Sequence, residues 1–273
     1  MELKGRLALI ASKVQKANIV ADIGTDHAYI PIFLVENGVC KSVIASDVRK
    51  GPLKAAKLNI KNAGFEDKIE TLMGDGLETI SENKADVIII AGMGGILISK
   101  ILTEGKAMAK SAKSLILQPM NRLDEVRKWL TENDFEIYDE ELCAEGEKIY
   151  NVICAKHFSQ ADIKKHKEKK NNENNKNNNK SGNRNSTGNS ISEAAYLFIG
   201  KKLIEKKDPL LGKMLKNKIR QLDKAIKEMK NSSSNGNVMK NDSDSVNETK
   251  RNESRDEYIE LRDDLKRIEN MIE

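Results

Sequence analysis

The chain has 273 residues, of which 38% are hydrophobic and 33% charged, a composition that fits one or two globular domains. Its three cysteines lie far apart without CxxC spacing, which argues against a disulfide framework or a zinc site and for a reducing compartment. The N-terminal segment is too short and too charged for a secretory signal, and no apolar run approaches the roughly 20 residues of a membrane span. We therefore expect a soluble, cytoplasmic protein with neither a membrane nor a metal partner.

Charge divides the chain into two halves. Residues 1–158 carry 21 Lys and Arg against 23 Asp and Glu, whereas residues 159–273 carry 26 against 19. A near-neutral half joined to a basic half indicates an anionic partner, with nucleic acid first. A basic tail that is merely solvated is an equally good interpretation.

Up to residue 158, short apolar runs alternate with stretches of helical spacing such as 52–63 and 122–132. The first five runs cover residues 19–23, 42–46, 69–73, 85–91 and 114–117. Such alternation predicts a parallel sheet with helices on both faces. The almost wholly apolar run ADVIIIA predicts a strand that is buried on both sides.

The last two runs of this half, 135–141 and 148–155, are joined only by a short segment around residues 143–147 that contains a glycine. That segment leaves no room for a crossover helix, so the two strands should pair antiparallel. By analogy, an open parallel sheet that ends in an antiparallel hairpin suits a methyltransferase better than a dinucleotide-dependent dehydrogenase. We therefore predict an α/β, Rossmann-like domain over residues 1–158.

The second half has a different character. Residues 159–191 are rich in Lys, Asn and Ser and are predicted to be a low-complexity linker. Helical spacing resumes over 192–229 and returns near the end of the chain, so residues 192–273 are predicted to form an antiparallel coiled-coil hairpin. A second Asn- and Ser-rich stretch, 231–254, is predicted to be a disordered insertion between its helices. The two apolar stripes are Leu215, Ile219, Leu222, Ile226 and Met229, and Tyr258, Leu261, Leu265, Ile268 and Ile272.

The loop after the first predicted strand carries the first chemical signal. Gly24 supplies the residue without a Cβ that lets this loop approach a nucleotide. Asp26 stands where the second glycine of GxGxxG would be, and a carboxylate there repels a pyrophosphate but can accept hydrogen bonds from an ammonium group. A tight turn with a helix N-cap at Asp26 is the alternative. His27 and Tyr29 face the same crevice or the helix face, and a buried structural histidine is as good an interpretation.

The later strand ends carry further candidates. Asp47 follows the second strand, some twenty residues after the glycine turn, where an acid commonly binds ribose hydroxyls. Asp75 lies between two glycines and can accept from an adenine amino group, although a turn closed by an Asx bond is the alternative. Gly92 and Met93 belong to the segment AGMGG, where the methionine offers a soft apolar wall for a planar base.

The segments ADIGTDHAYIP, ASDVRKGPL, GDGL, AGMGG and LILQP, in this order, resemble the bacterial tRNA (adenine-22-N1)-methyltransferases over residues 1–158. The basic two-helix tail is similar to that family's C-terminal coiled coil. The resemblance implies a class I methyltransferase fold, S-adenosylmethionine as cofactor, tRNA as partner, and methyl transfer to adenine N1. We expect the protein to act as a monomer.

The resemblance also implies a role for each matching residue. The methionine end of the cofactor is expected near Asp22, Gly24, Asp26 and His27, the ribose and adenine near Asp47, Val48, Asp75 and Gly76, and the transferred methyl near Gly92 and Met93. Adenine N1 already offers an in-plane lone pair, so we expect in-line alignment to supply most of the rate, without an obligate general base. The residues expected to act directly in catalysis are Asp26, His27, Tyr29 and Met93.

Three other functions remain open on the sequence alone. An NAD-dependent oxidoreductase would carry GxGxxG, which Asp26 contradicts. A non-enzymatic RNA-binding or scaffolding protein would leave the strand-end motifs without a reason. A third possibility is a methyltransferase that acts on ribosomal RNA, DNA or protein. Only the family resemblance favours tRNA over these substrates.

Overall fold

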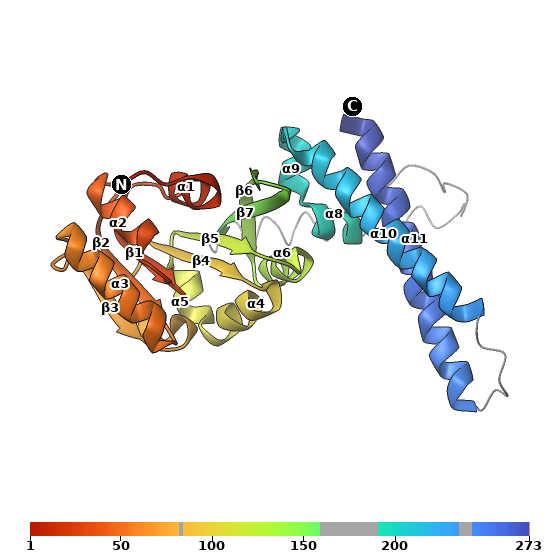
Figure 1. Cartoon of the computed structure of the whole chain (residues 1–273), viewed down its shortest axis with the longest axis horizontal. Helices are drawn as coiled ribbons and strands as arrows, with labels where there is room; N and C mark the ends of the chain where they lie inside the picture. Colours follow the sequence, from red (N-terminus) through yellow and green to blue (C-terminus); the bar gives the residue numbers. More distant parts are fainter. Residues whose placement is uncertain (82–83, 159–190, 235–241, 273) are drawn as a thin grey trace. The chain divides into compact units, whose positions relative to one another are not determined.

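The computed structural model describes residues 1–81, 84–158, 191–234 and 242–272. The chain separates into two compact units, Met1–Gly188 and Asn189–Glu273. In the described residues, the first unit contains one sheet with helices on both of its faces, and the second contains helices (Figure 1). Of the predicted linker, residues 159–190 lie outside the described part of the chain.

Seven strands form the sheet in the order β3-β2-β1-β4-β5-β7-β6 (Figure 1). The first five strands along the chain are parallel, and β7 runs antiparallel to both β5 and β6. The predicted parallel sheet with an antiparallel C-terminal hairpin is therefore confirmed. The strands are β1 (Ala17–Ile23), β2 (Cys40–Asp47), β3 (Ile69–Met73), β4 (Val87–Met93), β5 (Ser114–Pro119), β6 (Phe135–Glu145) and β7 (Lys148–His157).

The hairpin between β6 and β7 is tighter than predicted. Only Gly146 and Glu147 lie between the two strands, instead of the segment around residues 143–147. Gly146 has φ of +57°, which a two-residue hairpin turn requires and which glycine adopts without steric cost. The apolar pattern alone predicted strands that are too short at the turn, because the parts of the strands next to the turn carry charged side chains.

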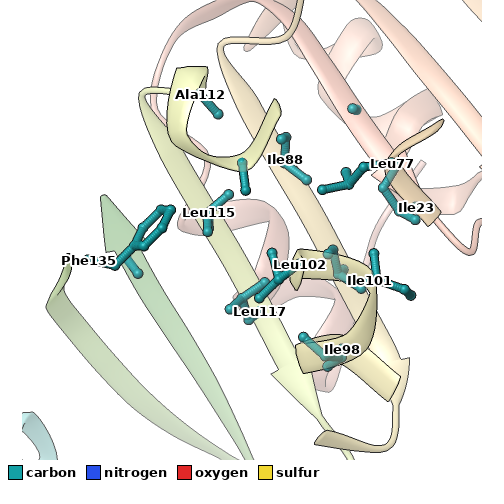
Figure 2. Close-up of a cluster of buried hydrophobic side chains, with 14 of the residues drawn as sticks. Ile23, Leu77, Ile88, Ile98, Ile101, Leu102, Ala112, Leu115, Leu117 and Phe135 are labelled. Carbon is teal, nitrogen blue, oxygen red and sulfur yellow. The ribbon is translucent and has the colours of Figure 1, made fainter. Parts of the chain in front are cut away.

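Two hydrophobic cores lie on opposite faces of the sheet. Along β4, Ile88 and Ile90 belong to one core and Ile89 to the other, so the strand is buried on both sides as predicted. Figure 2 shows the first core, in which Leu102 of α4 is among the side chains that cover the strands. Helices α4 (Gly95–Glu104), α5 (Lys106–Ser111) and α6 (Leu123–Glu132) contribute to this core, and α1 (Gly5–Ser12), α2 (Tyr29–Glu36) and α3 (Lys50–Ala63) to the other.

Burial of this kind makes the sheet a rigid frame. Each fully buried isoleucine or leucine contributes about 1.5–3 kcal/mol relative to an exposed one. Because the first five strands are parallel, all of their carboxyl ends lie at one edge of that frame. A short 3-10 helix, η1 (Gly76–Thr79), follows β3 at this edge.

The second unit contains α8 (Glu193–Ile199), α9 (Lys201–Lys206), α10 (Leu211–Ser234) and α11 (Asp242–Ile272). The helical pattern predicted over 192–229 is interrupted twice. Gly200, with φ of +106°, separates α8 from α9, and Lys207, with φ of +50°, ends α9. The Asp208 carboxylate then accepts a hydrogen bond from the Leu210 N–H at 2.9 Å just before α10 begins.

Helices α10 and α11 run side by side in opposite directions (Figure 1). Leu215, Leu265 and Ile268 from the predicted stripes are fully buried. The disordered insertion predicted over 231–254 is wrong in extent, because α10 continues to Ser234 and α11 begins at Asp242. Once a helix is nucleated by packing, it can extend through polar residues at little cost per residue.

Candidate active site

The turn after β1 is built on Gly24. Its N–H and that of Thr25 both donate to the Ser46 carbonyl of the neighbouring strand at 2.8 Å. Gly24 has φ of +77°, and a Cβ at this position would lie only 2.1 Å from Cε of Met93. The structure therefore brings two predicted site residues into direct proximity, and the positive φ disfavours a larger residue at Gly24.

Two carboxyl groups are buried beside this turn. The side chains of Asp22 and Asp47 lie on neighbouring strands and are 7% and 4% exposed. Burial raises the pKa of Asp22 to about 6, the nearby Thr25 hydroxyl opposes that increase, and the negative charge of Asp47 adds to it. Oδ1 of Asp47 accepts hydrogen bonds from the Arg49 N–H at 2.7 Å and from its Nε at 3.4 Å. Such a site favours a positively charged ligand.

The predicted catalytic residues of the same loop are exposed to solvent. Nε2 of His27 lies 3.5 Å from Oδ2 of Asp26, and these side chains are 45% and 66% exposed. The His27 ring stacks on the Tyr29 ring with centroids 5.2 Å apart and planes 17° apart. The Asn59 amide donates to the His27 carbonyl at 3.0 Å, which fixes the loop backbone.

Both alternatives for this loop are wrong. The N-cap of α2 is Ala28, in the left-handed region with φ of +57°, and not Asp26. His27 is too exposed to be a buried structural histidine. The two side chains are thus presented to solvent at the carboxyl edge of the sheet.

The ends of β2 and β3 complete this edge. Asp75 is exposed, and its backbone carbonyl accepts from the Glu78 N–H at 3.2 Å where η1 begins. Gly76 follows with φ of +52°. Exposed apolar side chains also occur at or just after the carboxyl ends of the five parallel strands, where a planar base could bind. They are Tyr29, Val48, Met73, Ile96, Leu97 and Met120.

The end of β4 is irregular, and its contacts include Arg6, a residue that the sequence patterns did not indicate. Gly92 interrupts the pairing of β4 with β5, has φ of +76°, and donates its N–H to Oε1 of the fully buried Gln118 at 3.2 Å. The same oxygen accepts from Nη1 of Arg6 at 3.3 Å, and the Arg6 guanidinium lies 5.6 Å from the Tyr150 ring centroid. Arg6 precedes the first strand, so no strand-end pattern could indicate it.

The predicted site residues therefore lie at the ends of adjacent strands, from Asp75 after β3 to Met93 in β4. Within the described ranges, no three His, Cys, Asp or Glu side chains group as a metal site requires. Among those same residues, no helix is long and apolar enough to cross a membrane. Carboxylates, glycine turns and apolar side chains dominate this edge.

Comparison with known proteins identifies the fold family. Residues 3–153 match the family model described as a methyltransferase domain. The chain belongs to this methyltransferase family. The predicted methyltransferase fold is thereby confirmed, and the sheet that ends in a hairpin is the methyltransferase sheet.

Individual relatives extend the comparison. The chain is 38% identical over 155 residues to the tRNA (adenine(22)-N(1))-methyltransferase of Bacillus subtilis, a match over 57% of this chain and 65% of that relative. The match thus covers slightly less than two thirds of the relative's own length. Among solved structures, the chain is similar to the B. subtilis m1A22 tRNA methyltransferase TrmK, at 26% identity and a TM-score of 0.72 over 95% of this chain and 98% of that one.

A second solved structure is that of Sp1610 from Streptococcus pneumoniae, for which a tRNA (m1A22) methyltransferase activity is suggested, in complex with S-adenosyl-L-methionine. This methyltransferase is 28% identical to the chain, with a TM-score of 0.71, and the alignment covers 96% of the chain and 97% of Sp1610. Both structural matches include the second, helical unit as well as the sheet.

Proposed function

We propose that this methyltransferase uses S-adenosylmethionine to methylate N1 of the adenine at position 22 of tRNA, in the cytoplasm. One observation carries the proposal. A glycine turn with a positive φ lies against Met93, next to the buried carboxyl groups of Asp22 and Asp47. The named relatives support the choice of tRNA adenine N1 as the acceptor.

The residues at the strand ends fit this cofactor. Gly24 permits the positive φ of the turn after β1, and Met93 lies directly against it. Two buried carboxyl groups and the exposed Asp26 suit an ammonium and a sulfonium, whereas they would repel the diphosphate of NAD. The charge of the site therefore disfavours the oxidoreductase alternative.

When bound, the cofactor supplies an electrophilic methyl group on its sulfonium. The protein residues would hold it in three parts. Asp22, Gly24, Asp26 and His27 would bind the methionine end, Asp47, Val48, Asp75 and Gly76 the ribose and adenine, and Gly92 and Met93 would lie beside the methyl group.

The same loop would orient the target base. The stacked His27 and Tyr29 rings are partly exposed and offer an aromatic surface for an adenine that has left its helix. Met93 would exclude water from the reacting atoms. Asp26 could accept a hydrogen bond from the adenine amino group, which would make N1 more electron-rich. Because N1 keeps an in-plane lone pair, no side chain has to remove a proton before transfer.

The helical unit offers a surface for RNA phosphates. Five cations on α10 are exposed and follow one another at intervals of three or four residues, on the side opposite its buried stripe. The first and last are 14 residues apart, which corresponds to about 21 Å along a helix. These cations are Lys213, Lys216, Arg220, Lys224 and Lys227. We propose that they bind the tRNA backbone.

The decisive experiment is incubation of the protein with labelled S-adenosylmethionine and tRNA, followed by nucleoside analysis. We expect 1-methyladenosine from a tRNA with adenine at position 22 and none when that base is changed to guanine. Methylation of ribosomal RNA, DNA or protein in place of tRNA would overturn the substrate, and no methyl transfer to any of them would overturn the reaction.

Substitutions separate the roles of the loop residues. Tyr29→Leu should raise KM for tRNA about tenfold through lost stacking, while Tyr29→Phe should stay near wild type. Asp26→Ala should lower kcat with little effect on tRNA binding. An unchanged kcat and KM in Asp26→Ala would remove that carboxylate from the reaction.

The phosphate surface is tested by salt dependence. The double variant Arg220→Gln/Lys227→Gln should reduce the slope of log binding constant against log salt by about 1.5–2. The control, Lys100→Gln/Lys128→Gln, removes the same charge from residues that pair with Glu104 and Glu132. Equal slopes for the two double variants would contradict the proposed role of α10.

A further inference from the structure

The ends of β4 and β5 remain hydrogen-bonded to each other where the two strands stop. The Met120 N–H donates to the Met93 carbonyl at 2.8 Å, and the Gly95 N–H donates to the Asn121 carbonyl at 3.0 Å. Met93 is the residue that the proposed function places beside the transferred methyl group. The backbone of Asn121 is therefore fixed next to the expected reaction centre.

The two glycines that follow Met93 allow this close approach. A Cβ on Gly95 would lie 2.1 Å from the Arg122 carbonyl oxygen, a backbone atom that cannot move aside without moving the chain. A Cβ on Gly94 would lie 3.1 Å from Oδ1 of Asn121. The carboxamide of Asn121 thus lies against the backbone of the residue directly after Met93.

The turn that carries Asn121 has a strained backbone. Arg122, the next residue, has φ of +47°, a conformation that is unfavourable for a residue with a Cβ. Its guanidinium binds the carboxylates of Asp124 and Glu125 in the first turn of α6, which holds the strained residue in place. Strain of this kind persists only where the surrounding contacts fix it, and it is common at binding and catalytic sites.

Within the part of the chain that the structure describes, the exposed carboxamide of Asn121 has no hydrogen-bond partner. The other amide at this strand end, Gln118, is fully buried and binds the backbone of Gly92. Met120 precedes Asn121 and is 43% exposed, and Ile96, which follows the glycine bonded to Asn121, is 60% exposed. An unpaired amide with exposed apolar neighbours offers a planar base hydrogen bonds at its rim and apolar contact on its face.

We propose that Asn121 recognises the target adenine through its Hoogsteen edge, the side that carries N6 and N7, an inference that rests on the proposed function. Methyl transfer to N1 requires the Watson–Crick edge to face the cofactor, which leaves the Hoogsteen edge for the protein to bind. A carboxamide matches that edge, because its oxygen accepts from the N6 amino group while its NH2 group donates to N7. The amino group has two hydrogens, so the one nearer N7 binds Asn121 and the one nearer N1 remains for Asp26.

This contact would also separate adenine from guanine. Guanine keeps N7 but carries an oxygen at position 6, which would meet the carboxamide oxygen, so repulsion replaces one of the two hydrogen bonds. Guanine also holds a hydrogen on N1, which blocks the reaction itself. Asn121 therefore adds a second reason for rejection, which acts when the base binds.

The test uses two tRNAs, one with adenine at the target position and one with 7-deazaadenine, in which a C–H group replaces N7. The measured quantity is the ratio of kcat/KM for the first tRNA to that for the second. Any effect of the replacement on the tRNA or on N1 cancels when this ratio is compared between enzymes. Asn121→Leu should lower kcat/KM for adenine about 10- to 100-fold and should lower the ratio about 3- to 10-fold below wild type. Asn121→Asp should lower the ratio further, because its carboxylate repels the N7 lone pair but not a C–H group.

Two controls accompany these variants. Asn62 is also an exposed amide, but it lies near the end of α3, away from the strand ends, so Asn62→Leu should keep the wild-type ratio. Calorimetric titration with S-adenosylhomocysteine should give Asn121→Leu a Kd within about threefold of wild type. A Kd weakened about tenfold or more would assign Asn121 to the cofactor and overturn the proposal.

The remaining outcomes separate this proposal from the proposed function. One common ratio for wild type, Asn121→Leu and Asn121→Asp would show that Asn121 does not bind N7, and the proposal would fail while tRNA methylation stands. An equal fall of the ratio in Asn62→Leu and Asn121→Leu would also overturn it. If wild type methylates neither tRNA, it is the proposed function that fails.

Discussion

Replacing Asp22 with asparagine should stabilise the folded protein at neutral pH, and more so as the pH rises. Burial raises the pKa of this carboxyl to about 6 from its ordinary value of 3.8. Ionising it in the folded state therefore costs about 3 kcal/mol once the pH is well above 6. Asparagine keeps the size of the side chain and removes the charge, so it avoids this cost.

The direction of this pH dependence follows from the difference in proton binding between the folded and the unfolded states. Between pH 4 and pH 6 the folded protein holds a proton on Asp22 that the unfolded chain has lost, so the contribution of Asp22 to stability falls as the pH rises. Above pH 6 both states are ionised and the cost is constant. Between pH 5 and 7.5 we expect the advantage of Asp22→Asn over wild type to grow by about 1.5 kcal/mol.

The assay is denaturant unfolding followed through Trp129. This is the single tryptophan of the chain, it lies in α6, and it is 8% exposed, so its fluorescence reports on the sheet-containing unit. An advantage of Asp22→Asn that does not change between pH 5 and 7.5 would refute the argument. The packing of the asparagine side chain can change the stability of the variant by the same amount at every pH, but it cannot create this pH dependence.

Asp86 provides a control of opposite sign. The Lys113 ammonium and the Asn18 N–H lower the pKa of its carboxyl. A lowered pKa contributes stability above the ordinary value, and that stability is lost as the pH falls. Asp86→Asn should therefore be less stable than wild type at neutral pH, and the deficit should shrink as the pH approaches 4.

Three further substitutions test other parts of the structure. Gly24→Ala should destabilise the sheet-containing unit by roughly 1–3 kcal/mol in unfolding followed through Trp129, because of its positive φ and the methionine methyl beside it; unchanged stability would contradict this tight turn. Arg127→Met should cost about 3–5 kcal/mol by leaving the buried Glu140 carboxylate without its guanidinium, which donates at 2.8 Å, and Arg127→Met/Glu140→Leu should recover most of that loss in the same assay. Leu265→Ala should cost roughly 2–5 kcal/mol in the helical unit, seen by circular dichroism; a shift of the Trp129 transition by the same amount would show that the two units unfold together.

The sheet could be derived from the sequence because its signal is local. Runs such as residues 85–91 are apolar on both faces, and this pattern specifies a buried parallel strand without reference to the rest of the chain. Glycines next to acids marked the strand ends for the same reason. A backbone that must turn sharply needs Gly24 whatever lies around it.

The ends of the helices were harder to predict from the sequence. Polar stretches such as 242–254 carry no apolar stripe, so pattern alone predicts disorder where α11 is already helical. The breaks at Gly200 and Asp208 interrupt a spacing that otherwise appears continuous. Neighbouring packing, which no window of sequence contains, decides these boundaries.

The sequence by itself determined which residue types stand at the end of each parallel strand, because the local hydrophobic pattern shows where each strand ends. Only the tertiary structure decided which distant residues meet there. Arg6 and Gln118 are 112 positions apart, yet they hydrogen-bond beside Gly92. The increased pKa of Asp22 is likewise a consequence of burial, since desolvation by surrounding atoms cannot be computed from neighbours along the chain.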